Sequence, residues 1–117
     1  MAAPFEELAE LDRLVHEPAR LSLLTALSVC RSADFLYLQR LTGLSKGNLS
    51  SHLAKLESSS LVNIEKEFVG KMPNTRVALT RTGRAAIDRH WKRLDKLRRE
   101  TSSWTGSAVK QRSRTSG

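Results

Sequence analysis

Cysteine is nearly absent from this sequence, which has one in 117 residues, Cys30. An internal disulfide is therefore excluded, and Cys30 continues an apolar series with Leu24 and Leu27, where core packing is favoured over a redox or metal role. Long apolar runs are also missing, since none approaches the ~20 residues that a membrane-spanning helix needs. The acidic N-terminus does not resemble a signal peptide. These absences predict a soluble, cytoplasmic protein with no membrane partner.

Patterns that support catalysis or metal binding are missing as well. The three histidines, His16, His52 and His90, have no cysteine or carboxylate at a spacing typical of a metal site or of a nucleophile and its base. There is also no glycine-rich phosphate loop. We therefore expect no catalytic residue, no metal, no cofactor and no enzymatic activity.

Acidic side chains are scarce beyond the first 17 residues. The whole chain has 20 Lys and Arg against 12 Asp and Glu, a formal charge of +8. Residues 1–17 hold five of the carboxylates and one arginine, a formal −4, which leaves +12 for the remainder. This balance indicates a polyanionic partner, either nucleic acid or an anionic membrane surface, and charge alone does not separate the two.

Residues 41–60 predict a turn followed by a helix with two distinct faces. Gly43 can end one helix in the left-handed conformation, and Ser45 can cap the next. An apolar stripe at spacings of four and three follows, formed by Leu49, Leu53 and Leu56. The opposite face has no carboxylate and consists of Gly47, Asn48, Ser51, Lys55 and Ser58. Such a face suits a polyanion at the helix N-terminus, although serine-rich faces also occur on ordinary solvated helices.

The remaining pattern predicts helices before this segment and a hairpin after it. Helices are expected over 5–15, starting at Pro4, from Pro18 to about Cys30, and from about residue 35, where a one-bridge strand at 34–36 could precede the helix. Residues 61–69 and 75–79 predict two strands joined by a basic turn at 70–74. A long helix capped by Thr80 or Thr82 should run to Trp104, with a disordered basic tail over 105–117.

The last helix has an apolar stripe that a domain of this size cannot cover alone. A helix of roughly 24 residues is about 36 Å long at 1.5 Å per residue. Its tryptophans could stack on bases, but their spacing favours a packing seam, and the first helix is acidic where the last is basic. We expect both helices to form a homodimer interface through Phe5, Leu8, Leu11, Val15, Ile87, Trp91, Leu94, Leu97 and Trp104.

The order of these elements resembles the winged-helix domains of prokaryotic transcription regulators in the MarR and ArsR classes. The resemblance rests on residues 17–27, 41–62 and 68–84. It implies a mainly α fold with a small β-hairpin (α+β), a winged helix-turn-helix over residues 1–104 with long terminal dimerisation helices. The chain lacks the paired Cys/His ligands of metal-sensing members, and its wing is expected to be short.

By this resemblance, a recognition helix at 45–60 enters the major groove and a wing at 68–77 lies on the backbone or minor groove. The matching positions are Lys46, Asn48, Ser50, Ser51, His52, Lys71, Asn74 and Arg76. Lys55, on the same helix face, is expected to contact phosphate. Asn48 could instead support the helix cap, and His52, beside the apolar stripe, could make a structural hydrogen bond.

We therefore expect a sequence-specific, double-stranded DNA-binding transcription regulator. It should be a dimeric repressor, associated with a prokaryotic nucleoid, that binds two half-sites about one helical turn apart. The alternative is a winged-helix protein-protein interaction module in a larger complex, because fold alone does not dictate function. Whether a small-molecule effector exists stays open.

Overall fold

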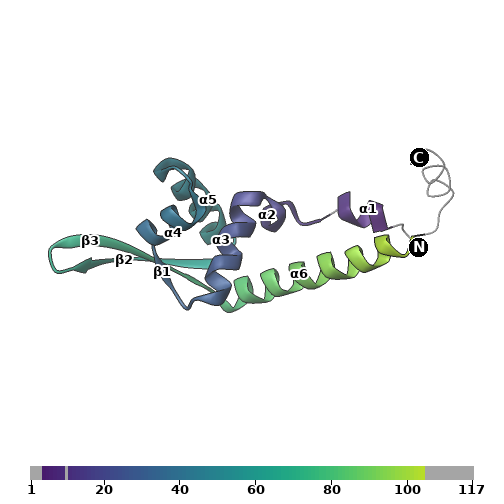
Figure 1. Cartoon of the computed structure of the whole chain (residues 1–117). Helices are drawn as coiled ribbons and strands as arrows, with labels where there is room; N and C mark the ends of the chain where they lie inside the picture. Colours follow the sequence, from purple (N-terminus) through teal and green to yellow (C-terminus); the bar gives the residue numbers. More distant parts are fainter. Residues whose placement is uncertain (1–3, 10, 105–117) are drawn as a thin grey trace. The chain divides into compact units, whose positions relative to one another are not determined.

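The computed structural model describes residues 4–9 and 11–104 of the chain (Figure 1). These residues belong to two units, which are treated separately below. One consists of residues 12–90, and the other combines residues 1–11 with residues 91–117. Helix α6 (Arg81–Ser102) contributes to both, with its residues up to His90 in the first unit.

In the first unit, an acidic side chain caps the N-terminus of each of the first two helices. Asp12 precedes α2 (Arg13–His16) and accepts a hydrogen bond from the backbone N–H of Leu14 at 2.9 Å. Glu17 precedes α3 (Pro18–Val29) and accepts from the backbone N–H of Ala19. Pro18 occupies the first turn of α3, where its missing N–H costs no helical hydrogen bond. The prediction of one helix over 5–15 is wrong, because α1 (Pro4–Ala9) ends before the capped start of α2.

The helix-turn-helix follows a very short strand. Strand β1 (Ala33–Asp34) leads into α4 (Phe35–Thr42), and α5 (Lys46–Ser58) is the second helix of the motif. Gly43 ends α4 with φ 72° and donates its N–H to the carbonyl of Gln39 at 2.9 Å. The hydroxyl of Ser45 accepts from the backbone N–H of Asn48 at 3.1 Å. The predicted turn and cap are confirmed.

The wing is longer than predicted. Strands β2 (Val62–Val69) and β3 (Met72–Leu79) pair along their whole length, and β1 pairs with β3, in the order β1-β3-β2. Only Gly70 and Lys71 remain for the turn, with Gly70 at φ 65°. The return strand was predicted to begin at residue 75 because Pro73 and Asn74 have turn chemistry. Pro73 is accommodated beyond the part of β3 that β1 covers, where one edge of the hairpin is open.

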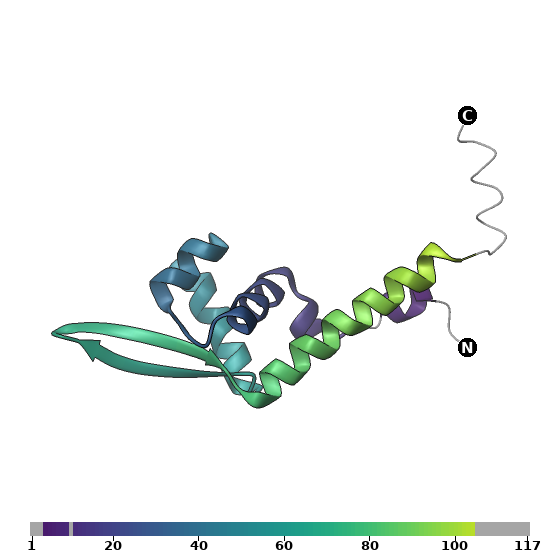
Figure 2. The ribbon, with the colours of Figure 1, turned by 60° about the horizontal axis from the view of Figure 1, so that its bottom comes forward.

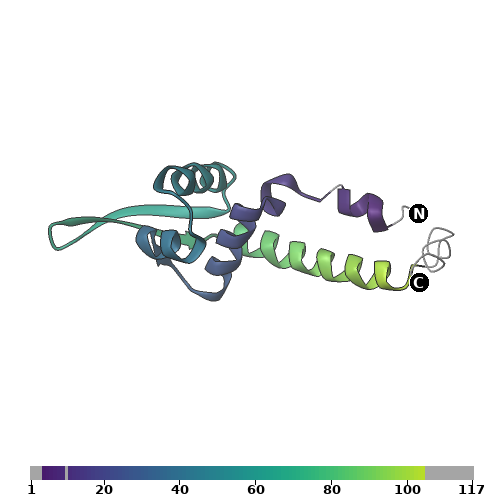
Figure 3. The same ribbon diagram turned by 45° about the horizontal axis from the view of Figure 1, so that its top comes forward.

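The core of the first unit joins the helices to the base of the hairpin. Leu49, Leu53 and Leu56 of α5 are at most 2% exposed, so the predicted stripe is confirmed. Figure 3 shows α4 and α5 beside the hairpin, whose tip extends past them. The buried cluster comprises Val15, Leu23, Leu24, Leu27, Ala33, Leu38, Leu49, Leu53, Leu56, Leu61, Val62, Val77, Ala86 and Ile87.

Hydrogen bonds and a close backbone approach hold the start of α6 against the corner between α5 and β2. The hydroxyl of Thr80 accepts from the N–H of Gly83 at 2.9 Å and donates to the carbonyl of Ser60 at 2.6 Å. A Cβ atom on Gly83 would lie 2.0 Å from the carbonyl oxygen of Leu61. Thr80 is thus the capping residue, and Gly83 permits a close backbone approach. Figure 2 shows α6 starting directly at the end of β3.

In the second unit, α1 contacts the end of α6. The rings of Phe5 and Trp104 meet edge to face, with centroids 5.7 Å apart. Arg93 donates to the carbonyl of Glu7 at 3.5 Å, and Leu97 is fully buried. Helix α1 and the end of α6 therefore contact each other within one chain. The tail predicted to be disordered, 105–117, lies outside the described residues.

Candidate nucleic-acid interface

The outward face of α5 is the largest run of exposed polar side chains on the helix-turn-helix. The predicted contact residues on it are all exposed: Lys46, Asn48, Ser50, Ser51 and Lys55. The first turn of α5 contains no acidic residue, and the helix has one carboxylate, Glu57, in its last turn. This face therefore offers hydrogen-bond donors and positive charge at the end of the helix that already favours anions.

The N-terminal cap of α5 leaves the side chain of Asn48 exposed. Ser45 caps the helix by accepting from the backbone N–H of Asn48, so the cap does not use the amide side chain. The backbone N–H of Leu49 bonds to the carbonyl of Ser45 at 2.9 Å, which begins the regular helical pattern. Asn48 combines a backbone role in the cap with an exposed amide that can contact a base edge.

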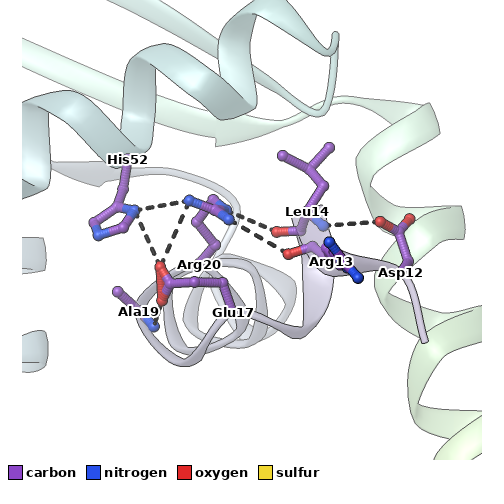
Figure 4. A network of polar contacts seen from close by, with 7 residues as sticks. All are labelled: Asp12, Arg13, Leu14, Glu17, Ala19, Arg20 and His52. Carbon is purple, nitrogen blue, oxygen red and sulfur yellow. Dashed lines mark hydrogen bonds and ion pairs between the residues drawn. The ribbon is translucent and has the colours of Figure 1, made fainter. Parts of the chain in front are cut away.

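His52 has a structural role in this fold. Its side chain is 21% exposed, and its Nδ1 lies 3.2 Å from Nη1 of Arg20 and 3.3 Å from Oε2 of Glu17 (Figure 4). Nδ1 either accepts from Arg20 or donates to Glu17, depending on the tautomer. Of the two interpretations of His52, the structure favours the structural hydrogen bond.

Arg20 is the centre of this network and was not singled out from the sequence. It is 9% exposed and donates through Nε to the carbonyl of Leu14 at 2.7 Å and through Nη2 to that of Arg13 at 3.4 Å. It also lies 3.5 Å from Glu17. The network connects α5 to the corner between α2 and α3. In the sequence, the only sign of this role is that Arg20 is a basic residue among the apolar positions of α3. That pattern does not reveal that its partner is His52, 32 residues away.

The register of the wing separates its charges onto two faces. Residues directly opposite each other on paired strands share a face. One face carries Lys66 opposite Thr75 and Phe68 opposite Pro73, and we call it the carboxylate-free face. It continues the face whose inner residues, Val62 and Val77, are buried with the leucines of α5. The other, the acidic face, carries Glu65 opposite Arg76 and Glu67 opposite Asn74.

Two of the predicted wing contacts lie on the acidic face. Asn74 donates to Glu67 at 3.5 Å, and Arg76 Nε lies 4.0 Å from the same carboxylate. Arg76 also donates to the hydroxyl of Ser32 at 2.8 Å, which ties β3 to the residue before β1. Lys71, in the turn, is exposed as expected. Lys66 is also exposed, and sequence analysis missed it because its face depends on the strand register.

The predicted dimer residues divide into buried and exposed sets. Val15 and Ile87 are 2% and 0% exposed in the core of the first unit, so their assignment to a subunit interface is corrected to core packing. Leu11 and Leu97 are also buried within one chain. The side chain of Leu8 lies outside the described part. Exposed or half-buried members remain, namely Phe5, Trp91, Leu94 and Trp104.

Residues 4–9 and 11–104 contain neither a membrane-spanning helix nor a cluster of potential metal ligands. No helix in these ranges is long and apolar enough to cross a membrane. The same ranges contain no group of three or more His, Cys, Asp or Glu side chains that could hold a metal ion.

The fold and the exposed face of α5 define a winged helix-turn-helix protein. The family model described as a winged helix DNA-binding domain matches residues 19–97, and the chain belongs to that family, which is one of DNA-binding domains and not of enzymes. Comparison with curated proteins gives no match.

Several solved structures share the fold. The transcriptional regulator homologue protein from Pyrococcus horikoshii has a TM-score of 0.74 and 28% sequence identity, over 82% of this chain and 94% of that chain. A MarR-family regulator from Silicibacter pomeroyi has a TM-score of 0.62 and 24% identity, over 93% and 70%. A mutant of MarR from E. coli has a TM-score of 0.68 and 21% identity, over 92% and 78%. The winged-helix fold of MarR-type regulators is confirmed.

Proposed function

We propose that this protein is a homodimeric, sequence-specific regulator that represses transcription by occupying double-stranded DNA. The observation that carries the proposal is the outward face of α5, which is exposed and has no carboxylate before Glu57. In a winged helix DNA-binding domain this is the helix positioned to enter the major groove. Its mechanism is steric and electrostatic, without chemistry on the DNA.

The side chains of α5 have distinct roles in this proposal. Lys46 and Lys55 contact phosphates, which position the helix without selecting a sequence. Asn48 reaches a base edge, where its amide can pair with N6 and N7 of adenine. Ser50 and Ser51 add donors that adapt to either kind of contact. Lys71, at the tip of the wing, contacts the backbone of the adjacent segment.

Dimerisation would place two copies of α5 on one duplex. The exposed aromatic side chains of the second unit support it, since Phe5, Trp91 and Trp104 are each at least 40% exposed. Burying such side chains against a second copy is favourable at roughly 25 cal/mol per Å² of apolar area. A two-fold dimer would then bind half-sites about one helical turn apart.

The test of specificity is selection of bound duplexes from a random pool, followed by titration of the winner and of an unselected duplex. We expect a two-fold symmetric sequence that binds at least about 1,000-fold more tightly than the unselected duplex. Equal binding of both would contradict sequence-specific regulation. For the dimer, Trp91→Asp should lower the dimer fraction in sedimentation equilibrium, whereas the exposed control Val29→Asp should not.

One observation favours the alternative of a protein-interaction module. Helix α4 exposes three large apolar side chains, Leu36, Tyr37 and Leu41, each more than half exposed. Exposed apolar groups on one helix are typical of protein contacts. A stoichiometric protein complex that survives high salt and nuclease, and that Leu41→Ser disrupts, would support this alternative over DNA binding.

A further inference from the structure

The ring of His52 faces two groups of opposite charge at the start of α3 (Figure 4). Its Nδ1 lies 3.2 Å from Nη1 of Arg20 and 3.3 Å from Oε2 of Glu17, and those two side chains are 3.5 Å apart. A guanidinium can only donate hydrogen bonds, whereas an ionised carboxylate can only accept them. The two partners therefore require opposite protonation states of the same nitrogen atom of His52.

The protonation state of the ring determines which partner it uses. A neutral ring with its proton on Nε2 has a lone pair at Nδ1, which accepts from Arg20. A protonated ring carries hydrogen on both nitrogens, so Nδ1 can only donate, and Glu17 is the acceptor within reach. Because the two partners are adjacent, this exchange changes the charge of α5 without requiring a large movement of the helix. Histidine is the side chain whose unperturbed titration falls near neutral pH.

The position of His52 connects this exchange to the proposed DNA-binding face of α5. Asn48 precedes His52 by four residues and Lys55 follows it by three, so both are its neighbours on the helix surface, and both are exposed. Within residues 4–9 and 11–104, the charged side chains that pair with the ring are Glu17 and Arg20, and Lys55 is the nearby titratable group on α5 itself. The ring is 21% exposed. Phosphates on this face would lie within the distance of about 10 Å over which charges interact in ordinary salt.

We propose that His52 is a proton-linked positioning residue, which accepts from Arg20 when neutral and donates to Glu17 when protonated, so that the protein takes up a proton when it binds DNA. The inference rests on the proposed function and specifies how binding at the same site is regulated. A polyanion near the ring favours the charged imidazole, and by reciprocal linkage the charged imidazole favours the polyanion. The ring itself needs no contact with DNA. Affinity for DNA should therefore rise as the pH falls through the range in which imidazole titrates.

The experiment measures the affinity of the full chain for the selected duplex at about pH 6 and about pH 8, at constant ionic strength. The ratio of the two affinities is compared between variants, because a loss of stability that weakens binding at both pH values leaves this ratio unchanged. Wild type should bind about threefold to tenfold more tightly at the lower pH, since one coupled proton changes affinity by at most about tenfold per pH unit.

Three substitutions identify the group that takes up the proton. His52→Gln has an amide that can accept from Arg20 or donate to Glu17 but does not titrate, so its ratio should be close to one. Glu17→Gln keeps an oxygen that can cap the backbone N–H of Ala19 but removes the charge that pairs with the protonated ring, so its ratio should fall below that of wild type. The matched control is His16→Gln, which changes a histidine that bonds His90 at 3.0 Å and should keep the wild-type ratio.

Nitrogen-15 NMR of the histidine rings gives a second measurement at a single pH of about 7. Addition of the selected duplex should increase the protonated fraction of His52, and an unchanged fraction would overturn the inference. If wild type does not prefer the selected duplex over the unselected one, the proposed function fails. If wild type shows that preference but His52→Gln has the same pH ratio, or wild type binds more weakly at the lower pH, the proton linkage alone is overturned. A ratio lost in His16→Gln and kept in His52→Gln would also overturn it.

Discussion

Nδ1 of His52, on the helix proposed to bind the major groove, lies 3.2 Å from Nη1 of Arg20, a buried side chain at the start of α3. Through this contact the orientation of α5 depends on the same guanidinium that bonds the carbonyls of Leu14 and Arg13. A buried charged group with several partners is costly to leave incomplete. The position of the proposed DNA-binding face is therefore linked to the stability of the α2–α3 corner.

Removal of the guanidinium should destabilise the fold strongly. Arg20→Met keeps most of the buried stem but removes the donors to two carbonyls and to His52. We expect the free energy of unfolding to fall by about 2–4 kcal/mol, as measured by urea denaturation. Arg13→Met changes an exposed side chain and serves as the control. Equal losses for the two variants would contradict the structural role of Arg20.

Substitutions of two α5 side chains should have different effects, one on the stability of the fold and the other on discrimination between bases. His52→Ala removes a partner of Arg20 and should lower the free energy of unfolding by about 1 kcal/mol, while weakening all duplexes alike. Asn48→Ala leaves its backbone N–H to the Ser45 cap and should relax discrimination at one base position by about 1–3 kcal/mol. Titration of single-base variants of the selected duplex checks how each substitution changes DNA binding. A change in base preference for His52→Ala alone would reverse these roles.

Alanine substitution at two helical glycines should change the stability of the protein in opposite directions. Gly83→Ala places a Cβ atom 2.0 Å from the carbonyl oxygen of Leu61, which is backbone and cannot move aside cheaply. Overpacking of this kind typically costs about 1–3 kcal/mol. A Cβ on Gly47 would meet nothing within 4 Å, so Gly47→Ala should stabilise by up to about 1 kcal/mol through helix propensity. Thermal unfolding of both variants distinguishes the two cases, and a stable Gly83→Ala protein would contradict the close approach.

The two faces of the wing should differ in their effect on salt dependence. Lys66→Ala removes a charge from the carboxylate-free face and should reduce the slope of log affinity against log salt by about one. Arg76→Ala breaks contacts with Ser32 and Glu67 on the acidic face and should lower stability with little change in slope. Anisotropy titrations at several salt concentrations give both slopes. The opposite ranking would place DNA on the acidic face.

Sequence patterns were sufficient for features that depend on near neighbours. The cap at Ser45, the left-handed Gly43 and Pro18 in the first turn of α3 each act on residues within four positions. The apolar stripe of α5 follows from helical periodicity alone. Periodicity gave the wrong prediction over 5–15, because the leucine spacing there is compatible with one continuous helix. In the structure, a local hydrogen bond from the backbone N–H of Leu14 to the side chain of Asp12 starts a new helix.

The length of the wing could not be derived from composition. Pro73 and Asn74 favour turns in isolation, and only pairing with Glu67 and Phe68 makes them part of a strand. The division of wing charges between two faces follows from that register, since a shift by one residue would move every side chain to the other face.

The sequence alone determined the kind of side chains on the proposed DNA-binding face, which is an α5 face with lysine, asparagine and serine and without a carboxylate in its first three turns. The tertiary structure decided which polar groups are still exposed to make contact. It placed His52 on Arg20 and Arg76 on Ser32, across 32 and 44 residues of chain, and left Lys66 exposed. The physical reason is that a polar side chain is satisfied by whatever packing and strand register bring within about 3 Å of it, and those neighbours are distant in sequence.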